Sequence, residues 1–493
     1  MWVLSGCLSN LARAERSKAC CHALLRNEQA RMNSSLSSHR CVALLVAAPA
    51  SGQGKTTVTA ALACWHTRQG RRVRVFKCGP DFLDPYWHQL ASGATVHNLD
   101  GWMVGMDEVR ARLSAAAAEA DVILIEGVMG LFDGSPTAAD LAVQLGIPVL
   151  LVVDASAMAG SFGALVLGMQ QYQPDLPWAG VLANRVGSSM HAQMLQNSLR
   201  DPALWLGAVQ RMGAGKDAQL LPERHLGLVA AHELPDAMAR LNAAADALAE
   251  TPLGQMDWTD WQRWSVEFSV PADGAVTPPE PWLQGRTVAV ASDAAFSFIY
   301  PANLDCLHAM GANLAFFSPL AGEGLPACDA VWLPGGYPEL HGDKLMANVA
   351  LQADLLTHVQ AGKPVWAECG GMLALGHGIA DAQGEHSPMW GIVPGTAQMQ
   401  PRLAGLGMQQ CALQAGVLRG HTFHYSRFVC EAPEVARTSR ANQRVQPDKG
   451  EAIYQYGSVY ASYFHAWFAS HPRAVAALLG AEAVQWDEPV PSA

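Results

Sequence analysis

The sequence has no hydrophobic run of the roughly 18 residues that a membrane-spanning helix needs. It is also poor in charge, at 15% of its 493 residues, and its net charge of −11 leaves no excess of Lys and Arg. A nucleic-acid surface requires clustered basic residues, so this balance argues against such a partner. The 11 cysteines are scattered without a CxxC pair or a zinc-type spacing. In a chain of this size, that pattern is typical of reduced, cytoplasmic thiols.

Residues 1–40 are polar and contain Arg and Ser with few acids, unlike the rest of the chain. They lack the continuous apolar core of a secretory signal. A transit peptide is one interpretation. We favour a disordered extension or an upstream start codon, with Met32 as the true start, because Met32 leaves a short polar lead into the first strand.

Half of the residues are hydrophobic, enough to bury large cores, and a typical size of about 150 residues per domain predicts two to four domains. Residues 41–245 repeat one pattern, in which a short apolar run leads through a turn into a helical stretch. Near-continuous apolar runs between helices predict a parallel sheet that is covered on both faces. The predicted strands of this α/β domain are residues 42–48, 73–76, 122–125, 149–153 and 180–183.

A second α/β series starts near residue 286 and is expected to extend to residue 478. Its predicted strands include residues 287–291, 314–317, 330–333 and 365–367. Between the two series, residues 246–285 hold three tryptophans and a Pro-rich stretch, which we interpret as a linker. The polar, Pro-bearing residues 479–493 are expected to form a loose tail.

A phosphate-binding loop is predicted directly after the first apolar run, where GQGKTT precedes a helical stretch. Glycines allow backbone N–H groups to approach a phosphate, Lys55 neutralises its charge, and Thr56 can ligate Mg²⁺. The sequence departs from GxxxxGK[ST] at the first glycine, which is Pro49. The predicted ATP-binding residues of this loop are Gly52, Gln53, Gly54, Lys55, Thr56 and Thr57.

Polar residues follow several predicted strands, at the edge of a parallel sheet where ligands bind. Glu126 ends an apolar run, where a solvated carboxylate is unexpected, and with Thr56 and Asp81 it is the candidate metal set. Asp81, Asp84 and Asp133 have the alternative of capping a helix or shaping a turn. Asn184 follows a later strand and is a candidate contact to the nucleotide base, with a turn role equally open.

Cys369 follows an apolar strand and precedes two glycines, which predicts that its sulfur lies at a strand-to-helix turn. A helix N-terminus beside the sulfur is expected to lower the pKa of the thiol and to favour a nucleophilic thiolate. The backbone N–H groups of Gly336 and Tyr337, which follow another strand, are the candidate oxyanion hole. His465 is the candidate base, and only the fold can bring it near Cys369.

Together these segments resemble the cobyrinate (or hydrogenobyrinate) a,c-diamide synthase family of cobalamin biosynthesis, over roughly residues 41–475. The matching stretches are APASGQGKTT, KCGPDFLDP, EGVMGLFDG, LVVDASAMAGS, NRVGS, LPGGYPEL, AECGGM, RGHTFHYS and ASYFHAWF. The resemblance implies a dethiobiotin-synthetase-like P-loop domain with a parallel sheet. It also implies a second domain of the class I glutamine amidotransferase type, with a flavodoxin-like α/β fold.

The resemblance further implies that ATP and glutamine are used to amidate the a and c carboxylates of a corrin ring, with Mg²⁺ as cofactor and ATP as co-substrate. Cys369 is the implied nucleophile, and Asp84 and Asp133 match acids linked to substrate handling. Because ammonia must stay unprotonated, we expect a protected path between the two sites. The expected partners are small molecules (ATP, L-glutamine and a corrinoid acid), not nucleic acid or membrane. Whether the chain forms a homodimer is left open.

Triad amidotransferases place a Glu two residues after the His, where this chain has Trp467. We therefore expect a Cys–His dyad, and what orients His465 is undetermined. The alternatives are a cobyric acid synthase acting on other side chains, a partitioning P-loop ATPase, and a nucleotide sensor without catalysis. The signature lysine of a partitioning ATPase would fall at Ala50. Intact Lys55, Cys369 and His465 argue against the sensor.

Overall fold

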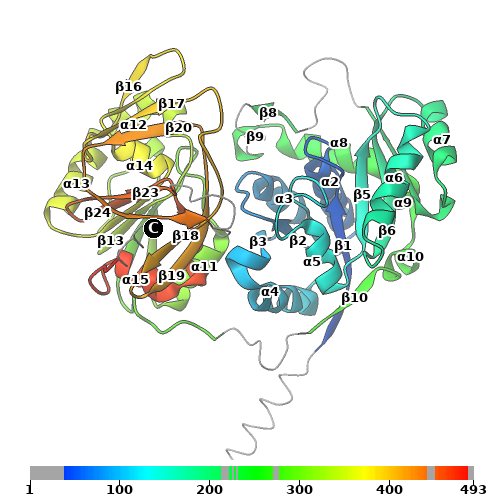
Figure 1. Ribbon diagram of the computed structural model, residues 1–493, viewed down its shortest axis with the longest axis horizontal. Coiled ribbons are helices and arrows are strands. Elements are labelled where there is room, and N and C mark those ends of the chain that lie inside the picture. Colours follow the sequence, from blue (N-terminus) through cyan, green and yellow to red (C-terminus); the bar gives the residue numbers. More distant parts are fainter. Residues whose placement is uncertain are drawn as a thin grey trace, which may run out of the picture.

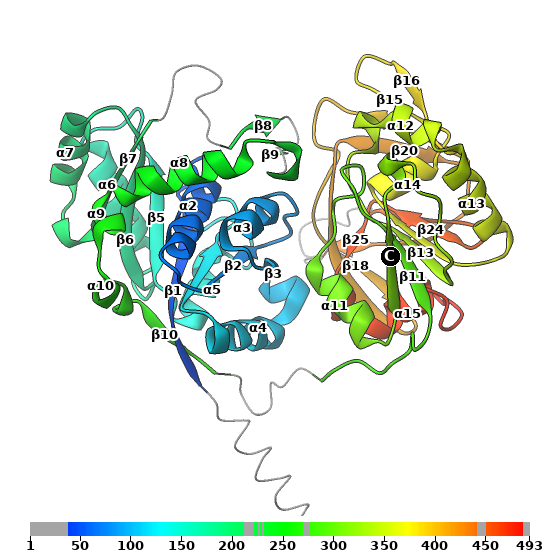
Figure 2. The same ribbon diagram turned by 180° about the vertical axis from the view of Figure 1, so that it is seen from behind.

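The computed structural model describes residues 38–211, 221–224, 227–228, 231–269, 277–440 and 450–486. The chain forms two α/β domains side by side, the first coloured blue to green and the second green to red (Figure 1). The view from behind shows the same two domains facing each other (Figure 2). The interpretation of Met32 lies outside the described residues. His39 and Arg40, which we had assigned to the N-terminal extension, already belong to the first strand.

The first domain is built on an eight-stranded sheet in the order β3-β2-β4-β1-β5-β6-β7, with β10 added beside β1. Neighbours along this order are all parallel, as the near-continuous apolar runs predict. The strands are β1 (His39–Ala47), β2 (Val73–Cys78), β3 (His97–Leu99), β4 (Val122–Glu126), β5 (Val149–Asp154), β6 (Trp178–Val186) and β7 (Trp205–Gln210). The predicted nucleotide-site residues lie in the segments after β1, β2 and β4, at the last residue of β4 and near the end of β6.

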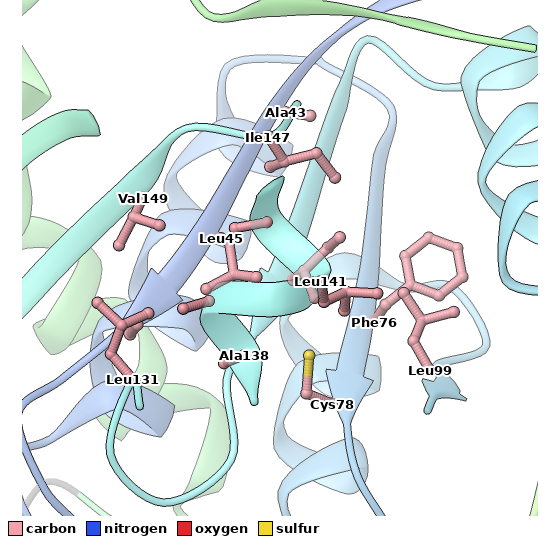
Figure 3. Close-up of a cluster of buried hydrophobic side chains, with 14 of the residues drawn as sticks. Ala43, Leu45, Phe76, Cys78, Leu99, Leu131, Ala138, Leu141, Ile147 and Val149 are labelled. Carbon is pink, nitrogen blue, oxygen red and sulfur yellow. The ribbon is translucent and has the colours of Figure 1, made fainter. Parts of the chain in front are cut away.

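Helices cover both faces of this sheet, so a separate buried cluster lies on each side. They are α2 (Lys55–Arg68), α3 (Asp84–Ser92), α4 (Met106–Glu119), α5 (Ala138–Leu145), α6 (Ser161–Tyr172), α7 (Ser189–Ser198) and α8 (Ala237–Ala249). On one face, Ala138 and Leu141 of α5 pack over Leu45 of β1 and Phe76 of β2 (Figure 3). Burying an aliphatic or aromatic side chain of this size contributes about 1.5–3 kcal/mol.

Most of the predicted linker belongs to the first domain, which corrects our interpretation of residues 246–285. The segment forms α9 (Pro252–Gln255), α10 (Trp258–Gln262) and β10 (Ser265–Phe268). β10 pairs antiparallel with the start of β1, so that His39 faces Phe268. The tryptophans fill the core, and Trp261 is fully buried against Trp65 of α2. Burying large aromatic rings stabilises the fold, and an exposed linker would lose that stabilisation.

The second domain holds a seven-stranded sheet in the order β12-β11-β13-β14-β24-β23-β21. The first five strands run parallel, β23 pairs antiparallel with β24, and β21 pairs antiparallel with β23. The strands are β11 (Thr287–Ala291), β12 (Asn313–Phe317), β13 (Ala330–Leu333), β14 (Val365–Glu368), β21 (Glu434–Arg437), β23 (Ala452–Tyr456) and β24 (Val459–Ser462). The helices are α11 (Pro301–Ala309), α12 (Gly342–Ala347), α13 (Val349–Gln360), α14 (Gly370–Leu375) and α15 (Pro472–Leu478).

Two smaller sheets complete this domain. One has the order β16-β15-β17-β20 and the other β22-β18-β19-β25. Their strands are β15 (Gly378–Ala380), β16 (His386–Pro388), β17 (Gly395–Met399), β18 (Gly405–Leu413), β19 (Gly416–His424), β20 (Ser426–Cys430), β22 (Ser439–Arg440) and β25 (His465–Ala466). β25 pairs with β19, which sets His465 opposite His421.

The described part of the predicted tail is packed, which corrects the expectation of a loose segment from residue 479. Leu479 is 1% exposed. The backbone N–H of Gln414 donates to the carbonyl of Gln485 at 2.9 Å, and the ring of Trp486 lies against Tyr460. Along the described ranges, no helix combines the length and apolar character needed to cross a membrane.

Candidate active site

The predicted phosphate loop joins β1 to α2, and Gly52 to Thr57 lie in the loop and the first turn of that helix. Gly54 has a φ of 93°, and a Cβ atom there would lie 2.2 Å from Asn184 Nδ2. Only glycine therefore fits this position without displacing Asn184. Lys55 is buried, and its Nζ donates to the Ala50 carbonyl at 3.2 Å.

Residues near the ends of β5 and β6 hold the loop in place. Asn184 Nδ2 donates to the Gln53 carbonyl at 2.9 Å. Arg185 Nη1 donates to the Gly52 carbonyl at 3.0 Å and pairs with Asp154 at 2.6 Å. Because its amide is bonded to the loop backbone, Asn184 has a structural role here, and the proposed contact to a base stays a prediction.

Thr56 and Glu126 meet directly, although 70 residues separate them in the chain. Thr56 Oγ1 donates to Glu126 Oε1 at 2.7 Å, and His88 Nε2 lies 2.5 Å from Glu126 Oε2. Burial would raise the pKa of Glu126, but Lys77, His88 and Thr56 outweigh it and lower the pKa to about 2. Glu126 is thus a buried carboxylate that stays ionised at neutral pH.

Lys77 lies at the centre of the acidic group. Its Nζ is 2.9 Å from Asp84 Oδ2, 3.4 Å from Glu126 Oε1 and 3.8 Å from Asp81 Oδ2, and its side chain is 3% exposed. Neither Lys77 nor His88 was predicted from the sequence as a site residue. A lysine at the end of an apolar strand was a readable signal, whereas His88 on α3 offered none.

The remaining predicted acids have different surroundings. Asp81 Oδ1 accepts from the backbone N–H groups of Leu83 and Asp84, so it shapes its own turn as well as facing Lys77. Asp133 is exposed, and its Oδ2 accepts from the N–H of Gly130 at 2.8 Å. Asp81 and Asp133 therefore both shape turns, and their proposed metal and substrate roles stay predictions.

Cys369 stands at a sharp turn between β14 and α14, as predicted. Its φ of 45° is rare for a residue with a side chain and marks local strain of the kind found at nucleophile turns. The expected low pKa is wrong for this state. Burial raises the pKa of the thiol, assisted by Glu339, and the Gly370 N–H lowers it by less. A neutral thiol needs a base to remove its proton.

The oxyanion hole is only partly as predicted. The Tyr337 N–H already donates to the Ala295 carbonyl at 3.0 Å, so it is not available to a substrate. A Cβ atom on Gly370 would lie 2.8 Å from Gly336 N, which places the turn after Cys369 beside Gly336. The N–H groups of Gly336 and Gly370 are therefore the better pair, and Gly370 was missed although it follows the cysteine directly.

Cys369 and His465 line two adjoining cavities. Cys369 lines one of about 40 Å³ with Gly336 and His424. His465 lines another of about 240 Å³, and Phe298, Tyr337 and Phe423 border both. Over the described ranges, no hydrogen bond joins the Cys369 sulfur to His465. The structure thus brings the two residues of the predicted dyad to adjoining cavities that share three lining residues.

The larger cavity lies between the two domains. The loop after β2 supplies Asp81, Phe82 and Asp84 to its lining, and the second domain supplies His465. The Phe82 ring stacks on Phe298 at 4.9 Å and lies 5.3 Å from the His465 ring. The domains also touch through Tyr86 Oη, which donates to the Ser297 carbonyl at 2.6 Å. Asp81 and Asp84 of the nucleotide site and His465 of the cysteine site thus line one cavity.

Both domains match known families. Residues 44–217 match the CobQ/CobB/MinD/ParA nucleotide binding domain, and residues 287–473 match the CobB/CobQ-like glutamine amidotransferase domain. A hydrogenobyrinate a,c-diamide synthase of Pseudomonas aeruginosa is 53% identical over 443 residues, which cover 89% of this chain and 98% of the relative. The chain belongs to the a,c-diamide synthase family.

Other members of the a,c-diamide synthase family align as fully. A hydrogenobyrinate a,c-diamide synthase of Stutzerimonas stutzeri is 53% identical over 90% of this chain and all of the relative. A cobyrinate a,c-diamide synthase of Herminiimonas arsenicoxydans is 48% identical over 92% and 99%. The partitioning-ATPase alternative leaves the amidotransferase match unexplained. The family resemblance and the two-domain fold predicted from the sequence are thereby confirmed.

Proposed function

We propose that this chain is a carbon–nitrogen ligase that uses ATP and glutamine to amidate the a and c carboxylates of cobyrinate or hydrogenobyrinate. The observation that carries the proposal is the 240 Å³ cavity, which Asp81 and Asp84 of the nucleotide domain line together with His465 of the amidotransferase domain. The names of the close relatives supply the substrate class. The reaction belongs to cobalamin biosynthesis and would take place in the cytoplasm.

The glutaminase half reaction begins with transfer of the Cys369 thiol proton to His465. The sulfur attacks the carboxamide carbon of glutamine, and the N–H groups of Gly336 and Gly370 stabilise the oxyanion. Collapse expels ammonia, which takes the proton from His465. Water then attacks the thioester, gives its proton to His465, and releases glutamate and the thiol.

The ligase half reaction has to make the carboxylate a better acyl donor, because its leaving group would otherwise be oxide. A carboxylate oxygen attacks the γ-phosphorus of ATP, and ADP leaves. Lys55 and the N–H groups around Gly54 counter the charge of the transferring phosphoryl group. Ammonia then attacks the acyl carbon, and phosphate departs.

Magnesium fits the donors that meet beside the loop. Mg²⁺ is usually held by one or two carboxylates with phosphate oxygens and water, and Thr56 Oγ1 lies 2.7 Å from Glu126 Oε1. Among the described residues, no group of three or more His, Cys, Asp or Glu side chains forms a metal cage. Thr56 and Glu126 would hold the ion, which would neutralise phosphate charge when bound.

The residues that line both cavities suggest where the protected path for ammonia runs. Ammonia released at Cys369 would pass Tyr337, Phe298 and Phe423 into the cavity that Asp84 lines. We expect these aromatic side chains to limit contact with water, which would keep ammonia in its unprotonated, nucleophilic form. Phe82 stands on this route between the two sites.

The test incubates cobyrinic acid and hydrogenobyrinic acid separately with the enzyme, Mg-ATP and glutamine, and follows the products by mass spectrometry. A gain of two amides on either acid, lost without ATP, supports the proposal and identifies the substrate. Cys369→Ala should lose glutamine-driven amidation and keep ammonia-driven amidation. Amidation of neither acid, with glutaminase activity intact, would refute the corrinoid assignment. Loss of the ammonia-driven reaction in Cys369→Ala would refute the division between two sites.

A further inference from the structure

The base of the glutaminase site has no visible orienting partner at the usual position. Trp467 stands two residues after His465, where triad enzymes have an acid, and it is fully buried against Tyr300. Its indole can accept no proton from an imidazole. The Nδ1 atom of His465 is buried and has no hydrogen-bond partner among the described residues. A buried polar atom left without a partner calls for an explanation.

A carboxylate lies on that side of the ring, from a different part of the chain. Glu368 Oε2 is 3.9 Å from His465 Nδ1, and no other carboxylate of the described chain is recorded within 4.0 Å of this histidine. Both side chains are buried, at 2% and 1% exposure. Catalytic hydrogen bonds are often long before the substrate binds, so a shortening of about 1 Å on glutamine binding is an ordinary adjustment.

Glu368 is also firmly held. Its other oxygen, Oε1, accepts from Trp366 Nε1 at 2.7 Å and from the Ala466 N–H at 3.2 Å. The second bond ties Glu368 to the residue next to His465. Asn303 fixes the same segment, because its Nδ2 donates to the Ala466 carbonyl at 2.8 Å. Oε1 therefore accepts from two donors, and Oε2 lies 3.9 Å from Nδ1 of the imidazole, with the Trp332 indole as a further neighbour of the carboxylate.

We propose that Glu368, the residue directly before the nucleophile, is the positioning acid of the glutaminase site and replaces the triad acid that Trp467 displaces. In this arrangement His465 Nδ1–H donates to Glu368 Oε2, which leaves Nε2 free to accept the thiol proton of Cys369. The imidazolium that forms is stabilised by the carboxylate. The inference rests on the proposed glutaminase role of Cys369 and His465.

The protonation states of the site show what such an acid contributes once the Cys369 thiolate, the other counter-charge, is consumed in the attack on glutamine. Burial raises the pKa of the Cys369 thiol, and burial with His421 and His424 lowers the pKa of His465 well below its usual value. Thiol and imidazole are thus both neutral at rest, and transfer of a proton between them creates two buried charges. A buried imidazolium without a counter-charge is strongly disfavoured. An ionised Glu368 supplies that counter-charge.

This requirement predicts how the reaction depends on pH. The ionisable groups around Glu368 are His465, Cys369, Tyr300 and, behind the His465 ring, His421. Burial holds all four neutral near pH 7 and raises the pKa of Glu368 to about 8. If Glu368 were protonated, it would donate to Nδ1 and the imidazole would carry its proton on Nε2, unable to accept another. The glutaminase rate should therefore rise with pH through about 8.

The test compares three variants in glutamine hydrolysis and in ammonia-driven amidation from pH 6 to 9.5. Glu368→Gln keeps the acceptor for Trp366 and Ala466, but its amide donates to His465 Nδ1 and fixes the wrong tautomer. We expect kcat for glutamine hydrolysis to fall about 10²-fold or more, with KM for glutamine unchanged and the rising limb near pH 8 abolished. Trp366→Phe should retain the limb and move it to higher pH, because one stabilising donor is lost.

Glu451→Gln is the matched control. Glu451 also raises the pKa of the Cys369 thiol, but its carboxylate bonds Thr422 and His424 instead of facing His465. The Glu451→Gln variant should therefore keep the rise of the glutaminase rate near pH 8. A Glu368→Gln enzyme that hydrolyses glutamine within threefold of the wild type, or that retains the limb, would overturn the proposal. Ammonia-driven amidation should be unchanged in every variant. Its absence from the wild type would instead count against the proposed function.

Discussion

Replacing the buried cation of the nucleotide site, Lys77→Met, should destabilise the first domain and abolish the ligase reaction. Lys77 Nζ lies within 4 Å of Asp81, Asp84 and Glu126, and the side chain is almost fully buried. Met has a similar length and fills the space, but it carries no charge. The change therefore removes the counter-charge without leaving a large cavity.

The size of the effect follows from Glu126. Its pKa of about 2 compares with 4.5 for the free side chain, and Lys77 is the largest of the groups that lower it. A difference of about 2.5 units corresponds to roughly 3 kcal/mol at neutral pH, which is the net effect of Lys77, His88 and Thr56 against burial. Breaking a buried pair by removing one partner costs about 3–5 kcal/mol, which agrees. A lowered pKa stabilises the fold above pH 4.5, and this contribution is lost as the pH falls toward 2.

Urea unfolding followed by tryptophan fluorescence measures the loss, because Trp87, Trp261 and Trp264 are buried in the first domain. At pH 7 we expect Lys77→Met to lose about 3 kcal/mol, with a smaller deficit below pH 4. Exposed Lys344→Met is the matched control and should change stability by less than about 0.5 kcal/mol. ATP-dependent amidation is assayed with free ammonia, which bypasses the glutaminase site.

A double variant separates charge from packing. Lys77→Met with Glu126→Gln removes both partners, so part of the stability lost in Lys77→Met should return. The reasoning is refuted if Lys77→Met is within 1 kcal/mol of the wild type at pH 7. It is equally refuted if Glu126→Gln lowers the stability of the Lys77→Met variant by as much as it lowers the stability of the wild type. The two groups would then act independently.

Three further outcomes are expected. Phe82→Ala should open the route between the sites, so that more than one glutamine is hydrolysed per amide formed, as measured by glutamate and product titration; an unchanged ratio would contradict the path. Gly335→Ala would put a Cβ atom 2.4 Å from His465 Cε1, so glutamine hydrolysis should fall at least tenfold while ammonia-driven amidation persists; equal loss of both would point to a folding defect. Thr56→Ala should lower the rate of ATP-dependent amidation and raise the Mg²⁺ concentration that the reaction needs. Thr56→Ser keeps the hydroxyl bonded to Glu126, so it should keep the wild-type rate and Mg²⁺ requirement. An inactive Ser variant would count against metal ligation by Thr56.

Much of the architecture was predictable because local sequence patterns determine it. The apolar runs that form β1, β4, β5 and β14 belong to parallel strands, since strands buried on both faces must be hydrophobic along their whole length. The glycines of the phosphate loop and the turn at Cys369 follow from backbone geometry that few other sequences allow. Where composition misled us, as in residues 246–269, tryptophans between two domains packed inward instead of forming a linker.

The sequence by itself determined the two chemistries, a phosphate loop around Lys55 and a nucleophile at Cys369, because each depends on a short contiguous segment. Only the tertiary structure decided their partners. Lys77 reaches the acids from β2, Glu368 at the end of β14 lies 3.9 Å from His465 of β25, and Phe82 contacts the second domain. These relations depend on strand order and burial, which bring together groups far apart in the chain and change their pKa values. No local pattern records such distances.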